Sequence, residues 1–290
     1  HENEKATAGF YQVFLENYNV DVELTTSQRA GFHKYTFPKN ETAQVVLDLE
    51  HRDKLLDYKI EMLDSNTLQG IRYSDNWARE QKVHFYMQFS KNLQSITFNE
   101  KHSVAGISFG KLQKPLLIKV GISAVSTEGA KVNLQAEIPH WDFEKTKAET
   151  TELWKKELST IVVEGNSDEQ KEIFYTALYH SLLNPNLYVD VDGHYNSTDL
   201  QKHHTDDKHY TIFSLWDTFR ATHPLFTLIQ QGRTNEFIRT FLRQYKEGGQ
   251  LPIWELAANY TGCMIGYHAI PVIADAYAKG IRDYDANLAL

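Results

Sequence analysis

Two short segments of the chain carry residue types that could bind a sugar together. In the first, Trp216 precedes Asp217, and Arg220 follows three residues later. Residues three apart share one side of a helix, so this carboxylate and this guanidinium could both reach vicinal hydroxyls through charge-assisted hydrogen bonds. In the second segment, Trp254 precedes Glu255. A Trp ring packs well on the C–H face of a pyranose, and we therefore predict that these five residues bind substrate.

Each of these features also has a purely structural interpretation. Asp217 could cap a helix and form a local salt bridge, while Trp216 fills a core. His268, downstream of the second segment, is more typical of a structural histidine than of a ligand. The run Cys263-Met264-Ile265-Gly266 is more typical of packing than of chemistry.

Other polar groups carry less information. Asp190 and Asp192 are typical of a turn, because no twelve-residue calcium loop continues from them. His203, His204 and His209 could bind a transition metal, but a solvated loop is the simpler interpretation.

Composition limits the class of protein and its partners. The residues are 41% hydrophobic and 23% charged, which is typical of folded domains. A length of 290 residues favours about two such domains. The net charge of −8 argues against nucleic acid or an anionic membrane as partner. No apolar run is long enough for membrane insertion, and the single Cys263 excludes an intrachain disulfide.

The first half has the alternation of β-strands. Apolar and polar residues alternate in Val20–Thr25 and in Leu116–Ile122. Further candidate strands are Tyr58–Leu63, Val83–Phe89 and Ser103–Phe109. Short strands separated by Asn, Asp, Gly and Pro favour an antiparallel β-sandwich that extends to about residue 140.

The second half has helical periodicity. A charged helix over about 145–161 would link two domains, and Gly165-Asn166 would break the chain after it. Ser167 and Gln170 form a capping-box pattern at the start of the next helix. We therefore predict a β-sandwich domain over 1–144, a helical linker over 145–166 and the first helices of a barrel over 167–290.

Turn residues divide this helical part further. Asp192-Gly193 predicts a hairpin between Leu187–Val191 and His194–Asn196. One helix should contain Phe237 to Tyr245 and end at Gly248-Gly249, and another should contain Ile270 to Tyr277 and end at Gly280. The chain begins at His1 without Met and ends at Leu290 within a predicted helix, so we expect it to be a segment of a longer protein.

Several of these motifs resemble those of glycoside hydrolase family 92. The similar runs are Phe213-Ser214-Leu215-Trp216-Asp217-Thr218-Phe219-Arg220-Ala221-Thr222-His223-Pro224-Leu225, Gly249-Gln250-Leu251-Pro252-Ile253-Trp254-Glu255-Leu256, Cys263-Met264-Ile265-Gly266 and Asp190-Val191-Asp192-Gly193-His194-Tyr195. In the first half, Gly31-Phe32-His33-Lys34-Tyr35-Thr36-Phe37-Pro38 resembles the N-terminal sandwich of the same family. The resemblance extends along nearly the whole chain.

The resemblance implies a fold and an activity. It implies an N-terminal β-sandwich followed by an (α/α)6 barrel, of which this chain would contain only the first helices. It implies inverting, calcium-dependent exo-α-mannosidase activity on mannose-containing glycans, in a protein exported by a bacterium. It assigns no calcium ligand in this segment. It also places the catalytic acid and base beyond residue 290, so we expect the segment alone to be inactive.

Two other functions fit the same residues. One is a non-catalytic carbohydrate-binding or interaction module built on the sandwich. The other is an (α/α)6-barrel enzyme that acts on another sugar. A module built only on a sandwich would not need the Trp216, Asp217 and Arg220 group, because that group lies in the helical half.

Overall fold

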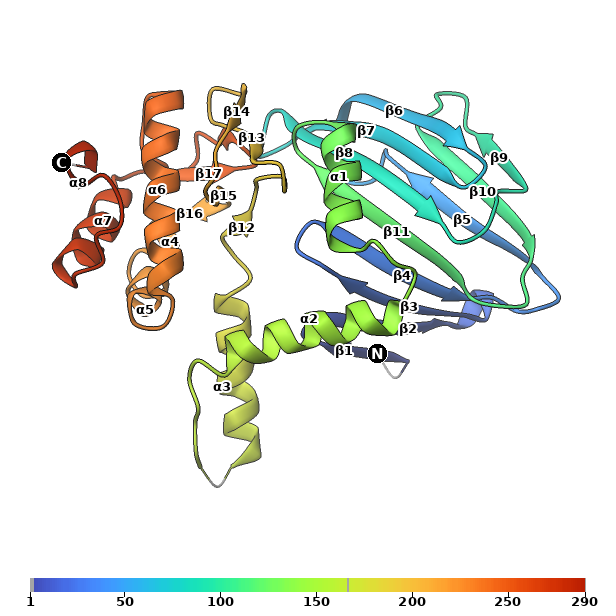
Figure 1. The fold of residues 1–290 in the computed structure, drawn as a ribbon, viewed down its shortest axis with the longest axis horizontal. Helices are drawn as coiled ribbons and strands as arrows, with labels where there is room; N and C mark the ends of the chain where they lie inside the picture. Colours follow the sequence, from blue (N-terminus) through green and yellow to red (C-terminus); the bar gives the residue numbers. More distant parts are fainter. Residues whose placement is uncertain (1–2, 166, 290) are drawn as a thin grey trace. The chain divides into compact units, whose positions relative to one another are not determined.

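The computed structural model describes residues 3–165 and 167–289, which form two compact units (Figure 1). The first unit contains residues 3–76, 82–156 and 190–192. The second contains 77–81, 157–165, 167–189 and 193–289. The units are therefore more interleaved along the chain than the three consecutive segments that the sequence predicts. Asn166 and Leu290, at a predicted break and in a predicted helix, lie outside the described residues.

The first unit is an antiparallel β-sandwich, as predicted. Its strands are β1 (Glu4–Thr7), β2 (Phe10–Leu15), β3 (Val20–Thr26), β4 (Ala30–Thr36), β5 (Thr42–Asp48), β6 (Lys54–Asp64), β7 (Thr67–Asp75), β8 (Gln81–Phe89), β9 (Ser95–Phe98), β10 (Val104–Lys111) and β11 (Leu116–Ser123). Eight of them form one sheet in the order β1-β2-β3-β4-β11-β8-β7-β6, and β5-β10-β9 form a second. A short 3-10 helix η1 (Glu16–Tyr18) follows β2.

Apolar side chains from both sheets form the core of the sandwich. In β10, buried and partly exposed residues alternate, so that Ala105, Ile107 and Phe109 face inward. They pack with residues of β8 and β11, including Phe89 and Ile118. The period-two alternation in the sequence therefore reflects one buried and one exposed face.

A helix that the sequence analysis missed covers the other face of the large sheet. This helix, α1 (Thr127–Glu137), lies against β11 in Figure 1 and begins at Ser126, whose Oγ accepts a hydrogen bond from Gly129 N at 2.9 Å. The helix approaches β11 so closely that a Cβ on Gly121 would lie 2.1 Å from the Ala130 carbonyl oxygen. The expectation of strands up to residue 140 is thus wrong over this segment.

The predicted linker helix is present as α2 (Phe143–Leu158). Asp142 precedes it, and its Oδ1 accepts a hydrogen bond from Lys145 N at 3.0 Å, as an N-cap does. Phe143 packs on Phe32 at 5.4 Å between ring centroids. The part of α2 up to residue 156 therefore belongs to the first unit and contributes to its packing.

The second unit contains mostly helices and very short strands. Its helices are α3 (Asp168–Ser181), α4 (Leu215–Thr218), α5 (Thr222–Ile229), α6 (Gln231–Gly248), α7 (Ala269–Ala278) and α8 (Ala286–Ala289). Its strands are β12 (Asn186–Leu187), β13 (His194–Asn196), β14 (Lys202–His204), β15 (Tyr210–Thr211), β16 (Phe213–Ser214), β17 (Trp254–Leu256) and β18 (Asn259–Tyr260).

The helix ends agree with the sequence, but one predicted hairpin is wrong. Gly249 ends α6 in a left-handed conformation with φ of 84°, and Ser167 caps α3 by accepting a hydrogen bond from Gln170 N at 3.3 Å. The strands on either side of Asp192-Gly193 do not pair with each other. Instead β12 pairs with β15 and β13 pairs with β14. Each strand beside the turn thus takes a partner that follows β13 in the sequence.

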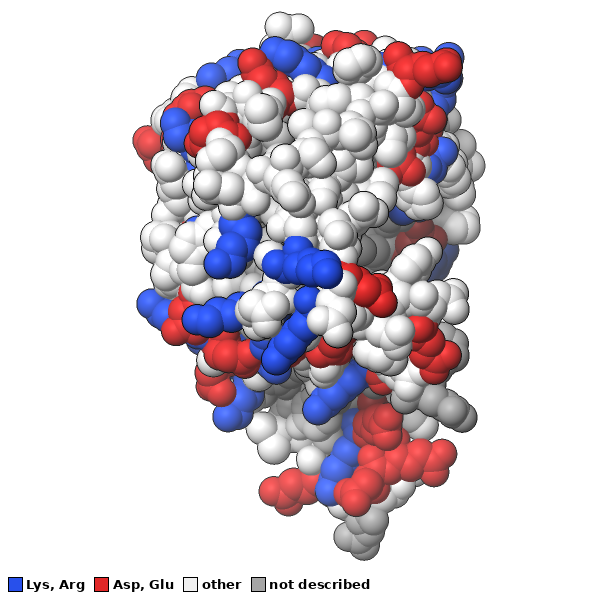
Figure 2. All heavy atoms as spheres, turned by 90° about the vertical axis from the view of Figure 1, so that its right-hand side faces the viewer, with Lys and Arg blue, Asp and Glu red and all other residues white. Residues whose placement is uncertain are grey.

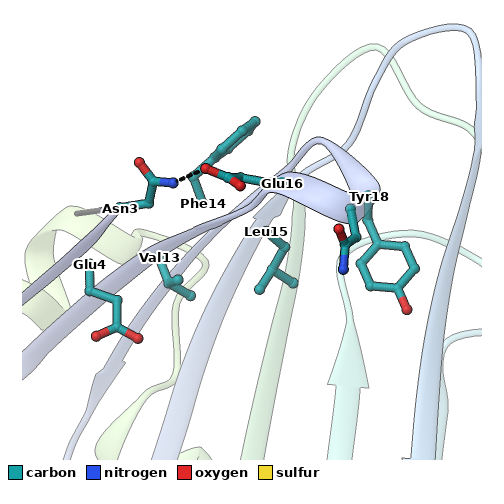
Figure 3. Close-up of a pocket in the computed structure, with 8 residues that line it drawn as sticks. Asn3, Glu4, Val13, Phe14, Leu15, Glu16 and Tyr18 are labelled. Carbon is teal, nitrogen blue, oxygen red and sulfur yellow. Dashed lines mark hydrogen bonds between the residues drawn. The ribbon is translucent and has the colours of Figure 1, made fainter. Parts of the chain in front are cut away.

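On the face shown in Figure 2, basic and acidic side chains are intermixed and a broad area carries neither. A groove of about 600 Å³ runs along β1, β2 and η1, with the exposed Phe14 and Tyr18 on it (Figure 3). It shares no residue with the predicted sugar site. No helix of the described residues is both long and apolar enough to cross a bilayer.

Candidate sugar site

A small sheet in the second unit brings the two predicted segments together. Strand β16 pairs with β17, so that Ser214 lies opposite Trp254 and Phe213 lies opposite Glu255. The next residue after β16, Leu215, begins α4 and donates its N–H to the Ile253 carbonyl at 3.3 Å. Trp216 and Trp254 are therefore carried by neighbouring backbones although 38 residues separate them in the sequence.

Trp216 and Asp217 are exposed rather than packed in a core. Trp216 is 45% exposed, and the carboxylate of the exposed Asp217 accepts a hydrogen bond from Ser214 Oγ. Asp217 is the third residue of α4, and the Asp217 carboxylate does not cap the helix. The structure thus differs from the alternative in which Asp217 is a buried N-cap beside a core Trp.

Arg220 lies differently from the expectation. Helix α4 ends at Thr218, so Arg220 does not share a helix face with Asp217. Among the described residues the two form no ion pair. The Arg220 guanidinium instead lies 4.9 Å from the Phe219 ring centroid, and that ring lies 4.3 Å from the ring of His268. Both charged groups are therefore available to a ligand.

Trp254 forms an aromatic pair that the sequence analysis missed. Its ring centroid lies 5.7 Å from that of Trp77, which is 52% exposed and lies in the connection between β7 and β8. Trp77 is 177 residues away from Trp254 and carries no recognisable motif. Only the fold reveals that a third Trp, besides Trp216 and Trp254, lies in this part of the second unit.

A small cavity adjoins Trp254. It has a volume of about 240 Å³, and Trp254, Ser214, Thr218, Pro185 and His223 are among the residues that line it. His223 is 3% exposed, and burial lowers the pKa of its imidazole to about 4. The imidazole is therefore neutral at physiological pH and is surrounded by the rings of phenylalanines.

The buried position of Glu255 contradicts the prediction that this residue contacts a sugar. Its side chain is 1% exposed, and its two oxygens accept hydrogen bonds from Thr211 Oγ1 (2.8 Å), Ala258 N (2.7 Å) and Ile212 N (3.1 Å). Burial raises the pKa of this carboxyl to about 7, although these hydrogen bonds act in the opposite direction. The reason is geometric. Consecutive residues of a strand point to opposite faces, so Trp254 and Glu255 cannot face the same ligand.

Two other candidates, Asp190 and His209, have structural roles. Asp190 is buried in the first unit, where it accepts hydrogen bonds from Ser123 Oγ (2.6 Å) and Asn133 Nδ2 (2.7 Å). His209 is 1% exposed and stacks on Tyr195, so the expectation of a solvated loop is wrong there.

The Cys263–Gly266 segment differs from the expectation that it packs. Ile265 is 80% exposed and is largely unpacked among the described residues, while Met264 is 41% exposed and only partly packed. No three His, Cys, Asp or Glu side chains among residues 3–165 and 167–289 lie close enough together to hold a metal ion.

Two protein-family domains match this chain. The model of the glycosyl hydrolase family 92 catalytic domain matches residues 129–290, and that of its N-terminal domain matches residues 1–123. The chain belongs to glycosyl hydrolase family 92. The catalytic-domain match contains both segments of the candidate sugar site, and Trp77 lies in the N-terminal-domain match.

Solved structures agree with this family 92 assignment. A family 92 α-mannosidase from Bacteroides thetaiotaomicron superposes with a TM-score of 0.94 at 32% identity, covering 100% of this chain and 42% of that one. An inverting family 92 mannosidase of the same bacterium has a TM-score of 0.90 at 29% identity, covering 100% of this chain and 41% of that one.

A curated relative is more distant in sequence. An uncharacterized secreted glycosidase of Arthroderma benhamiae is 22% identical over 96% of this chain and 37% of its own length. The family 92 chain thus spans about two fifths of the length of the relatives it matches.

Proposed function

We propose that the protein containing this chain removes terminal mannose from α-mannosides by exo-hydrolysis with inversion at the anomeric carbon. Family membership supports a glycosidase. The substrate class is supported by the similarity to an α-mannosidase that was also solved in complex with mannoimidazole. The stereochemistry is supported by the similarity to an inverting mannosidase.

The observation that carries the proposal is the pairing of β16 with β17. This pairing places an exposed Trp, an exposed carboxylate and a second Trp on adjoining backbones. In the proposed complex, a Trp ring covers the C–H face of the sugar. Asp217 accepts hydrogen bonds from hydroxyl groups, and Arg220 donates to them. Both interactions are charge-assisted and therefore stronger than those between neutral groups.

The catalytic acid and base are proposed to lie outside this segment. Inverting hydrolysis needs two carboxyl groups roughly 6.5–9.5 Å apart with a water between them. Glu255 is unsuited to this task because its oxygens already accept three hydrogen bonds from its own unit. Asp217 is assigned to substrate binding.

Calcium dependence is likewise a proposal that rests on the resemblance. The described residues offer no cluster of three metal-binding side chains, so no calcium ligand is assigned among them and no step is derived through the ion. Export is also proposed, and the secreted glycosidase of Arthroderma benhamiae supports it.

The test uses the full-length protein with an aryl α-mannoside and with α-linked manno-oligosaccharides. Release of mannose is expected, with the β-anomer as first product by NMR, and exhaustive treatment with EDTA should abolish it until calcium is restored. Failure on all α-mannosides would overturn the substrate class. Full activity after chelation would overturn only the calcium dependence. Binding of mannan without any hydrolysis would favour a carbohydrate-binding module.

A further inference from the structure

The buried Glu255 lies at the centre of the sheet that carries Trp254. It occupies the middle strand β17, opposite Phe213 of β16 and Tyr260 of β18. A carboxyl group in such a place is costly to bury and needs a compensating role. Its hydrogen bonds indicate what that role is, because two of its three donors are backbone amides.

Both amides belong to residues with an unfavourable backbone conformation, and so does that of Ala257, which precedes Ala258. Ile212, Ala257 and Ala258 have φ of 67°, 50° and 64°, the left-handed region that residues other than Gly, Asn and Asp seldom adopt. Ala257 and Ala258 form the two-residue loop between β17 and β18. With φ positive at both positions, such a loop normally contains Asn-Gly or a similar pair. The Ala-Ala sequence does not favour this turn by itself.

Glu255 and Thr211 provide the missing stabilisation. Glu255 accepts from the N–H groups of Ile212 (3.1 Å) and Ala258 (2.7 Å), and Thr211 Oγ1 accepts from that of Ala257 (2.7 Å). Thr211 in turn donates to Glu255 at 2.8 Å. Each left-handed residue is thus held by this one pair of side chains.

The turn is connected to both members of the Trp pair. Trp254 directly precedes Glu255, and its carbonyl accepts hydrogen bonds from Thr261 N (3.2 Å) and Thr261 Oγ1 (2.8 Å). Asn259, which follows the turn, accepts from Glu80 N at 3.1 Å and donates to Glu80 O at 3.3 Å. Glu80 lies three residues after Trp77. The position of the turn therefore determines where the two rings meet.

We propose that Glu255 is a positioning residue of the sugar site, which holds the Ala257-Ala258 turn and thereby fixes the Trp77–Trp254 pair. The inference rests on the proposed function for its kinetic test only. Glu255 touches no ligand, and its effect on the sugar passes through the turn.

The variant Glu255→Gln is nearly isosteric and tests this role. A Gln amide has one acceptor oxygen, so either Ala258 N–H or Ile212 N–H would face an NH2 group. In the full-length protein, KM for an α-mannoside should rise about tenfold, the equivalent of one lost buried hydrogen bond, while kcat changes less. The near-UV circular dichroism of the Trp residues should weaken as the pair loosens.

A repair variant distinguishes positioning from direct contact. Replacing Ala257→Asn and Ala258→Gly in the Glu255→Gln background supplies a sequence that favours this turn without a carboxylate. It should restore most of KM and of the near-UV signal. The matched control is Glu137→Gln in the first unit, where Glu137 also accepts three hydrogen bonds, from Ser27 Oγ, Arg29 N and Arg29 Nη1. This control should lower stability and leave KM unchanged.

Three results would overturn the proposal. The first is an unchanged KM and near-UV signal in Glu255→Gln. The second is a loss of kcat that turn repair does not reverse, which would indicate a direct catalytic role. The third is an equal rise of KM in Glu137→Gln, which would indicate general destabilisation. If the parent protein hydrolyses no α-mannoside, the proposed function fails, and the near-UV signal with its repair still tests the positioning role.

Discussion

The sandwich and the small β16-β17-β18 sheet differ in how their backbone N–H and C=O groups find hydrogen-bond partners. In the sandwich, strands of up to eleven residues pair over long ladders, and a cluster of apolar side chains fills the space between the sheets. In the small sheet, strands have two or three residues and the central strand buries a carboxylate. Short ladders leave backbone groups to be satisfied by side chains, and those side chains also set the shape of the site.

The largest effect is expected in the sandwich core. Phe89 is fully buried and packs on Phe109 at 5.2 Å between ring centroids. Replacing Phe89→Ala should destabilise the first unit by about 3–5 kcal/mol, because it leaves a cavity. Denaturant unfolding of the full-length protein measures this. KM in the surviving folded fraction should be unchanged, and a large rise in KM would show that the sandwich core also shapes the site.

The next effect concerns pH and the buried carboxyl of the small sheet. The pKa of Glu255 is about 7 in the folded state against 4.5 for an ordinary Glu, so its contribution to stability is full below pH 4.5 and is lost as pH rises through 7. At about 1.36 kcal/mol per pKa unit, the loss is about 3 kcal/mol. The difference in unfolding free energy between the parent and Glu255→Gln, measured from pH 4 to 8, gives the pH-dependent contribution of Glu255. Parallel curves would contradict it.

A smaller effect on stability, but a clear one on activity, is expected at Asp217. Removing this exposed carboxylate in Asp217→Ala should cost about 1.5–3 kcal/mol of transition-state binding, or at least tenfold in kcat/KM. The melting temperature should change little. Asp168→Ala, an exposed Asp on α3, is the control and should have normal kinetics. A lowered melting temperature with normal kinetics would make Asp217 structural.

The smallest effect is expected at a helix cap far from the sugar site. Replacing Ser167→Ala removes the hydrogen bond to Gln170 N and should cost about 1 kcal/mol. Ser181→Ala at the other end of α3, where the hydroxyl only donates to the Ala177 carbonyl, should be close to neutral. Thermal unfolding of both variants makes the comparison, and equal effects would show that the cap contributes nothing specific.

The sequence revealed regular elements better than contacts between distant residues. Strands β3 and β11 could be predicted because their alternation reflects one buried face. Helix α1 could not, because its buried residues include Gly129, Ala130 and Asn133, which give a weak apolar stripe. The close approach to Gly121 that requires small residues is a property of the fold.

The candidate site shows the same limit. Trp216, Asp217 and Trp254 were predicted from residue type and spacing, and the structure brings their two segments together. Glu255 was misplaced because a strand of three residues is too short for its alternation to be recognised. Trp77 was missed because nothing local distinguishes it from any exposed Trp.

Asp190 has a consequence for dividing the protein into modules. Residues 190–192 complete the first unit, although they follow more than thirty residues of the second in the chain. A recombinant fragment that stops at residue 156 would lack Asp190, and the Asn133 amide and Ser123 hydroxyl would lose their buried acceptor. The sandwich cannot be excised by one cut without this loss. A circularly permuted or two-piece form of the first unit would have to include residues 190–192 as an added segment.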